Sequence, residues 1–413
     1  MNTYYKLFKQ SIKIGKNEII ELKRTLKTSQ NKEIRKFYIK QLENALKLNK
    51  NFIQILIKNR QLKSYEFYSA NLSKLIPKID EEEHFKWWFE FFKWKTSENL
   101  QLQNPFMLEN VKIISKDNSD INPNHSAIYT TFQYGSSQSI IGYLISNNVN
   151  LVLLVDQKSY DNKAIFEQYI DKTITFLGKD VSYDILNVES SNTILKLISY
   201  IKRGYSVFAY PDGNDGIGGV FNKKAQLLKI KFFSGEIFVR VGLAHLSFAT
   251  KTPIIPIISS YEENLFPRIS VYPDISPKDI KDRDDYSTKT TKKLWQILEN
   301  HINSYPAQWS GWDYVHKYFD FENMQRNNNS IMNNEVLETN NKIKLNRKKY
   351  RIFKIDDQAY LFNRILYKTY PIDMELFDIL STQKGYTKDQ ILKKSIKIQL
   401  LNELIENGVF TFI

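Results

Sequence analysis

The pattern of apolar and polar residues divides the chain into four regions. Over residues 1–105, apolar residues such as Leu42, Ala45 and Leu46 recur at helical spacing between charged ones, which predicts a helical N-terminal region. Short apolar runs alternate with amphipathic stretches over residues 106–320. Residues 321–345 are rich in asparagine and predict a linker, and a compact unit resumes over residues 346–413.

The second region has the rhythm of an α/β domain. Short β-rich apolar runs predict buried strands at Ala127–Phe132, Leu151–Val155, Ser206–Tyr210 and Ile254–Ile258. Helices are predicted between the strands or beside them, at Ile165–Ile170, Asn192–Ile201 and Val239–Thr250. Strands that alternate with helices form a mainly parallel sheet flanked by helices, so the fold class that we expect is α/β.

The last region predicts a small α+β module. Two strands, Tyr350–Ile355 and Ala359–Phe362, form a hairpin, and the rest of the module is predicted as three helices and a final strand: Asp373–Leu380, Thr387–Lys393, Ile398–Asn407 and Val409–Phe412. This order resembles the winged-helix recognition domains that are fused to peptide-modifying enzymes. The resemblance implies that a peptide adds to the edge of the hairpin as an extra strand. A plain structural appendage is the alternative.

An aromatic run ends the helical N-terminal region. Phe85–Lys95 interleaves tryptophan and phenylalanine with lysine, which suits a membrane–water interface. The same composition also suits a helix that packs within its own domain. We favour the packed helix because the aromatic residues occur on every face and leave no clean polar side.

The charge of the chain limits the classes of partner, and its cysteine content limits the chemistry. Lys and Arg number 59 against 45 Asp and Glu, a net charge of +14, so nucleic acid, anionic lipid headgroups and an acidic carrier protein are all candidates. Nucleic acid is disfavoured because the predicted recognition helix Ile398–Asn407 carries Glu403 and Glu406 and no Arg or Lys. The chain has no cysteine, which excludes thiol nucleophiles and disulfides.

The apolar runs are also too short to span a bilayer. We expect a cytoplasmic protein, with peripheral attachment to the inner face of the cell membrane left open. No metal site or cofactor is predicted.

Five blocks in a fixed order carry a resemblance between Ile114 and Phe319. They are Gln133–Gln138, Gly204–Asp212, Gly219–Phe221 with Lys231–Gly235, Gly242–Ala249 with Thr252–Pro256, and Tyr305–Trp312. In this order the region resembles the lysophospholipid acyltransferase superfamily, and in particular the late acyltransferases of lipid A biosynthesis. The resemblance implies transfer of an acyl group from acyl-carrier protein or acyl-coenzyme A to a lipid or peptide acceptor.

The first block differs from the family at the positions that do the chemistry. Acyl transfer from a thioester needs a base beside the acceptor hydroxyl, usually a histidine oriented by a carboxylate. The family has such a pair where this chain has Gln133 and Gln138, and an amide accepts no proton usefully at neutral pH. The residues therefore indicate altered or absent acyl-transfer chemistry.

Other residues are candidates for the same site. Asp212 follows a predicted strand and enters a glycine-rich loop, so it should border the ligand cleft of a parallel sheet, although a cap or turn role is as good an interpretation. His125 and His245 are weaker candidates for the base. The residues predicted to bind substrate are Tyr134, Gly135, Ser136, Ser137, Gly213, Lys223 and Lys224.

Two functions remain open from the sequence. The first is an acyltransferase that uses a non-standard site. The second is a catalytically inactive homologue that binds a peptide or a lipidated partner for another enzyme. The first needs a base within reach of the cleft, whereas the second needs only the shape of the cleft.

Overall fold

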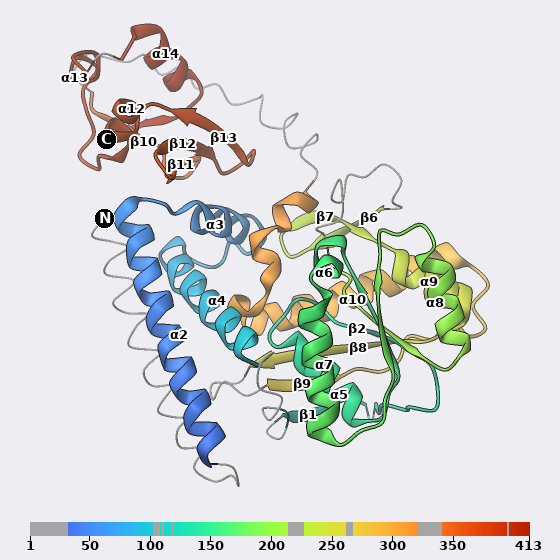
Figure 1. Cartoon of the computed structure of the whole chain (residues 1–413). Coiled ribbons are helices and arrows are strands. Elements are labelled where there is room, and N and C mark those ends of the chain that lie inside the picture. Colours follow the sequence, from blue (N-terminus) through green and yellow to red (C-terminus); the bar gives the residue numbers. More distant parts are fainter. Residues whose placement is uncertain are drawn as a thin grey trace. The chain divides into compact units, whose positions relative to one another are not determined.

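The computed structural model describes residues 32–101, 108, 111–117, 119–213, 227–261, 267–319, 341–394 and 396–413. Two compact units are present. Among the described residues, one contains Lys50–Phe85 and Phe319–Ile413, and the other contains residues 32–49 and Lys86–Tyr318. The larger unit holds the α/β sheet, and the smaller one holds the C-terminal strands and helices (Figure 1).

A mixed sheet forms the centre of the larger unit. Its strands lie in the order β1 (Lys112–Ser115), β9 (Pro267–Val271), β8 (Ile254–Tyr261), β2 (Ile128–Thr130), β5 (Ser206–Ala209), β3 (Leu151–Val155) and β4 (Tyr183–Asn187). The strands from β8 to β4 are all parallel, while β9 runs antiparallel to β8 and parallel to β1. The prediction of a mainly parallel sheet is therefore confirmed.

Helices cover both faces of this sheet. On one face α5 (Ser137–Ser146) and α7 (Lys163–Leu177) lie side by side and share a core with alternate strand residues such as Tyr129, Leu153 and Phe208 (Figure 1). Because side chains alternate along a strand, the residues between these face the other side. There α8 (Thr193–Lys202) packs on β5 and contacts α9 (Gly242–Thr250), which in turn packs on α10 (Arg283–Ser304).

One predicted helix is wrong at its start. The sequence predicted a helix from Val239, whereas Val239 and Arg240 end strand β7 (Gly235–Arg240), which forms a hairpin with β6 (Leu227–Phe232). The helix α9 begins only at Gly242. In β7 the side chains of Ile237 and Val239 are buried and their neighbours are less so, which is the period of a strand. The apolar residues of β7 run directly into those of α9, so the sequence did not show where the strand period gives way to the helical one.

The aromatic run lies in helix α4 (Glu81–Gln101), after the helices α2 (Lys32–Asn59) and α3 (Lys63–Leu75). Phe85, Trp88 and Phe91 are buried, so these aromatic residues serve as core. In the part of the chain that the structure describes, no helix combines the length and the apolar character that crossing a membrane requires.

The strands and helices that were predicted for the C-terminal region occur in the predicted order, and a further strand, β10 (Ile343–Leu345), precedes them within the stretch predicted as a linker. Strands β11 (Tyr350–Ile355) and β12 (Gln358–Asn363) form the hairpin, and β13 (Lys368–Ile372) adds a third antiparallel strand that the sequence did not predict. Three helices follow, namely α12 (Met374–Ser381), α13 (Lys388–Leu392) and α14 (Ile398–Glu406). The last strand, β14 (Phe410–Phe412), pairs with β10 (Ile343–Leu345).

Buried charges join segments of the smaller unit that are distant in sequence. The Arg351 guanidinium on β11 lies 3.3 Å from the Glu66 carboxylate on α3, and both side chains are almost fully buried. Arg364 lies 2.7 Å from Glu81, which Arg351 also contacts. Such pairs add little net stability but are costly to break, because the remaining charge is buried without compensation.

We therefore expect Arg351→Met to lower the free energy of unfolding by about 3–5 kcal/mol. The double variant Arg351→Met/Glu66→Leu should recover most of that loss, since no uncompensated charge then remains at Glu66. Denaturant unfolding of the full chain measures both. A double variant as unstable as the sum of its two single variants would contradict this account.

Candidate functional site

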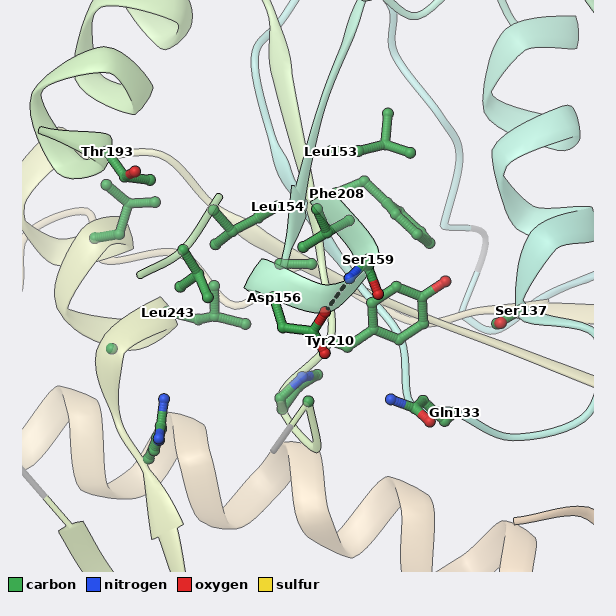
Figure 2. Close-up of a pocket in the computed structure, with 18 of the residues that line it drawn as sticks. Gln133, Ser137, Leu153, Leu154, Asp156, Ser159, Thr193, Phe208, Tyr210 and Leu243 are labelled. Carbon is green, nitrogen blue, oxygen red and sulfur yellow. Dashed lines mark hydrogen bonds between the residues drawn. The ribbon is translucent and has the colours of Figure 1, made fainter. Parts of the chain in front are cut away.

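A cavity of about 910 Å³ opens within the larger unit, at the carboxyl ends of its parallel strands. One part is apolar, with residues from β3, α8, β5 and α9 that include Leu153, Leu154, Leu197, Phe208 and Leu246. The other part is polar, and its lining includes Lys95, Glu98, Gln133, Ser137, Gln138 and Tyr210. In Figure 2, Gln133 and Ser137 lie on one side of Tyr210, and Leu243 and Thr193 lie on the other.

The loop after β2 brings the first sequence block to the cavity. Gln133 lines the cavity, as do Ser137 and Gln138 in the first turn of α5. Gly135 has a φ of +59°, and its N–H donates to the Gln308 carbonyl at 2.9 Å. Its absent Cβ would stand 2.3 Å from the Ser259 carbonyl oxygen, so only glycine fits this turn.

Asp212 is a buried anchor for that loop. Its carboxylate accepts the Gln133 N–H at 3.1 and 3.2 Å and the Trp309 indole N–H at 2.9 Å. Its own carbonyl accepts hydroxyl hydrogen bonds from Tyr314 and Tyr318. These four contacts tie the end of β5 to the loop after β2 and to the segment that closes the domain.

Burial sets the protonation of this anchor. It raises the pKa of the Asp212 carboxyl to about 7, against the hydrogen bonds from Trp309 and Gln133, which favour the charged form. The side chain is fully buried, and Asp212 is not among the residues that line the cavity. Both carboxylate oxygens are thus engaged inside the protein.

The structure brings together part of the predicted set. Gln133, Ser137, Gln138 and Gly213 line one cavity. Tyr134 and Ser136 are buried beside it, and the Tyr134 hydroxyl donates to the His301 carbonyl at 2.9 Å. That Tyr134, Gly135, Ser136 or Asp212 meets substrate stays a prediction. Lys223 and Lys224 lie outside the described residues.

The two weaker histidine candidates lie apart. His125 precedes β2 in an exposed turn and does not line the cavity. His245 lines it from α9, where burial and the charge of Arg283 lower its pKa. It lies near the charges of Arg283 and Asp284, at the start of α10.

Sequence reasoning missed Glu98. This residue lies near the end of α4, and the Ser137 hydroxyl donates to its Oε1 at 3.0 Å. Burial raises the pKa of the Glu98 carboxyl to about 7, while hydrogen bonds from Ser137 and Gln138 and the charge of Lys95 act in the opposite direction. No local signal marks this glutamate, because it is one acidic residue in a polar helix end, far in sequence from the block that it contacts.

Within the described ranges, no group of three or more His, Cys, Asp or Glu side chains is arranged to hold an ion.

The match to a family model covers four of the five sequence blocks and begins after the first block, Gln133–Gln138. Residues 158–319 match the model of the bacterial lipid A biosynthesis acyltransferases. No curated protein matches the chain. Among solved structures, one that is similar is the 1-acyl-sn-glycerophosphate (LPA) acyltransferase PlsC from Thermotoga maritima. It is 12% identical, with a TM-score of 0.30, over 62% of this chain and 98% of that one.

The α/β unit has a mainly parallel sheet, flanking helices and a cavity at the carboxyl ends of the strands, and its residues 158–319 match the acyltransferase model. Over residues 158–319 the chain is similar to the lipid A biosynthesis acyltransferase family.

The tight turn at Gly135 leads to a testable prediction. Gly135→Ala forces a Cβ against the Ser259 carbonyl and places a side chain at positive φ, so we expect a loss of about 2–5 kcal/mol in unfolding free energy. Gly178→Ala is the matched control, since Gly178 also has positive φ but nothing within 4 Å of the added carbon. It should lose only about 1–2 kcal/mol. Equal losses in chemical denaturation would refute the steric account.

The role of Asp212 as an anchor leads to a further prediction. Asp212→Asn replaces one acceptor oxygen by a donor, so the Gln133 or the Trp309 N–H loses its partner inside the protein. The expected cost is about 1–3 kcal/mol of unfolding free energy at pH 8. Asp282→Asn is the control, because Asp282 caps α10 and asparagine caps helices nearly as well. If both variants unfold at the same denaturant concentration as the native chain, Asp212 is no anchor.

Proposed function

We propose that the protein transfers an acyl group from a carrier thioester, acyl-carrier protein or acyl-coenzyme A, to a lipid or peptide acceptor at a non-standard site. The cavity is the observation that supports this most directly. Its apolar part has the lining that an acyl chain requires, and its polar part is lined by Gln133 and Gln138, which the resemblance aligns with the family's catalytic pair. The thioester carbonyl would lie between the two parts, beside Gln133 and Ser137.

The amides at these positions suit a role that differs from that of the family pair. Gln133 and Gln138 cannot act as bases, but their side-chain N–H groups can donate hydrogen bonds to a developing oxyanion. In this proposal Asp212 supports the site by holding the Gln133 backbone. Gly213 and Ser137 line the space that the donor would occupy.

A second candidate function, peptide binding by residues 346–413, is favoured by one observation. Strand β13 is largely exposed and, in the described part of the chain, pairs with β12 alone. An open strand edge can accept an extended peptide by backbone hydrogen bonds. Pro371 lacks an N–H and limits the usable edge to the first part of the strand. The peptide would be an acyl acceptor in an enzyme, or a bound partner in an inactive homologue.

The test measures thiol release from acyl-coenzyme A and acyl-carrier protein. Thiol reagents report only the product, because the chain has no cysteine. A labelled acyl group and a source-cell extract, separated into lipid and peptide fractions, identify the acceptor. Label in the peptide fraction would favour the module as an acceptor site. The absence of thiol release with every donor and fraction would refute acyl transfer and leave the binding function.

The cavity itself is tested by filling it. Leu197→Trp on α8 should lower kcat/KM for a long acyl donor about tenfold or more, with little effect on an acetyl donor. Leu195→Trp is the matched control on the same helix, since Leu195 is exposed and does not line the cavity. If Leu197→Trp leaves the preference for chain length unchanged, the acyl chain binds elsewhere.

A further inference from the structure

Glu98 is a buried acid–base group that contacts the first sequence block, where the resemblance aligns Gln133 and Gln138 with the family's catalytic pair. It comes from α4, which precedes the sheet, so it lies outside the region that resembles the acyltransferases. Its carboxylate accepts the Ser137 hydroxyl at 3.0 Å, and it lines the cavity together with Gln133 and Gln138. Three residues of the first block thus surround the same polar space as this carboxylate.

The other acid–base groups are placed less well for that work. Both carboxylate oxygens of Asp212 are engaged by the Gln133 and Trp309 N–H groups, and the residue does not line the cavity. His245 lines the cavity from α9 and lies near the charges of Arg283 and Asp284. Within the described residues, no hydrogen bond joins either group to Ser137 or Gln138.

We propose that Glu98 is the general base of this site and that Ser137 is its positioning residue, an inference that rests on the proposed acyl transfer. Glu98 takes the proton of an acceptor hydroxyl as the hydroxyl oxygen attacks the thioester carbonyl. The new C–O bond forms, the C–S bond breaks, and Glu98 passes the proton to the leaving thiolate. The carboxyl thus returns to its charged form, and no further reactant is required.

The surroundings of Glu98 give its carboxyl a pKa that suits a general base. Burial raises the pKa of its carboxyl to about 7, where a general base works best near neutral pH. The groups that face it are Ser137 and Gln138 on α5, Lys95 on its own helix and Tyr210 at the end of β5. Lys95 is also paired with Asp313 at 2.9 Å. Tyr210 keeps its proton, because burial raises its pKa far above neutrality.

A purely structural role makes a different prediction. The N-cap residue of α5, Ser136, makes no side-chain cap hydrogen bond, so Glu98 could serve that helix as a cap. A cap affects stability, whereas a base affects how the rate depends on pH and on the strength of the nucleophile. These kinetic readouts separate the two roles.

The experiment uses the full chain with dodecanoyl-pantetheine as donor and either butanol or hydroxylamine as acceptor. Hydroxylamine is a strong nucleophile as the neutral molecule and depends little on a base. Glu98→Gln should lower kcat/KM with butanol about 10²–10⁴-fold and abolish the acid limb of the pH profile near pH 7. With hydroxylamine the same variant should lose less than about tenfold. That retained activity also shows that the variant is folded.

Ser137→Ala supplies an independent readout. The Ser137 hydrogen bond lowers the pKa of Glu98, so its removal should raise that pKa and move the acid limb of the butanol reaction to higher pH. Glu83→Gln, an exposed substitution on the same helix, and His245→Gln should leave the limb in place. An acid limb that moves with His245→Gln instead would overturn the assignment.

Two further outcomes are distinct. If Glu98→Gln keeps native butanol transfer and its acid limb, the glutamate is only a cap, and the acyltransferase function stands without it. If the native chain releases no thiol with either acceptor, acyl transfer fails, and the role of Glu98 fails with it.

Discussion

The site depends on one buried carboxylate. Asp212 receives N–H groups from Gln133 and Trp309, and its carbonyl receives the hydroxyls of Tyr314 and Tyr318. In a water-free interior each of these donors would be costly to leave without an acceptor. The Asp212 contacts therefore fix the loop after β2 against the closing segment of the domain. The position of Gln133, and through it the geometry of the polar part of the cavity, follows from that arrangement.

The cavity combines two kinds of lining because the sheet and its helices supply them from different places. Apolar side chains come from β3, β5, α8 and α9, whose packing is fixed by alternation along the strands and by helical period. Polar side chains come from the loop after β2, the first turn of α5 and the end of α4. The second group lies where hydrogen bonds, rather than packing, decide the conformation. In the proposed reaction, catalysis and acyl-chain binding are thus set by different parts of the sequence.

The sequence predicted the parts of the fold that have a clear period. Strands such as Leu151–Val155 and helices such as Asn192–Ile201 were found because their apolar residues repeat at one spacing. The hairpin of β6 and β7 was missed, since exposed lysines interrupt its apolar residues and a helix follows closely. Of the site, Gln133, Ser137 and Gln138 were found through a motif. Glu98 was not, because its partner Ser137 is brought to it only by tertiary folding.

The span of the family match has an evolutionary consequence. It begins at residue 158, after Glu98, Gln133 and Gln138, yet it includes most of the apolar lining of the cavity. The residues proposed to act in catalysis thus lie outside the matched stretch, and most of those that line the apolar part of the cavity lie inside it. A lineage could exchange its acid–base groups while keeping its binding chamber unchanged. Descent traced through residues 158–319 alone would then group proteins by the shape of the chamber rather than by the acid–base groups beside it.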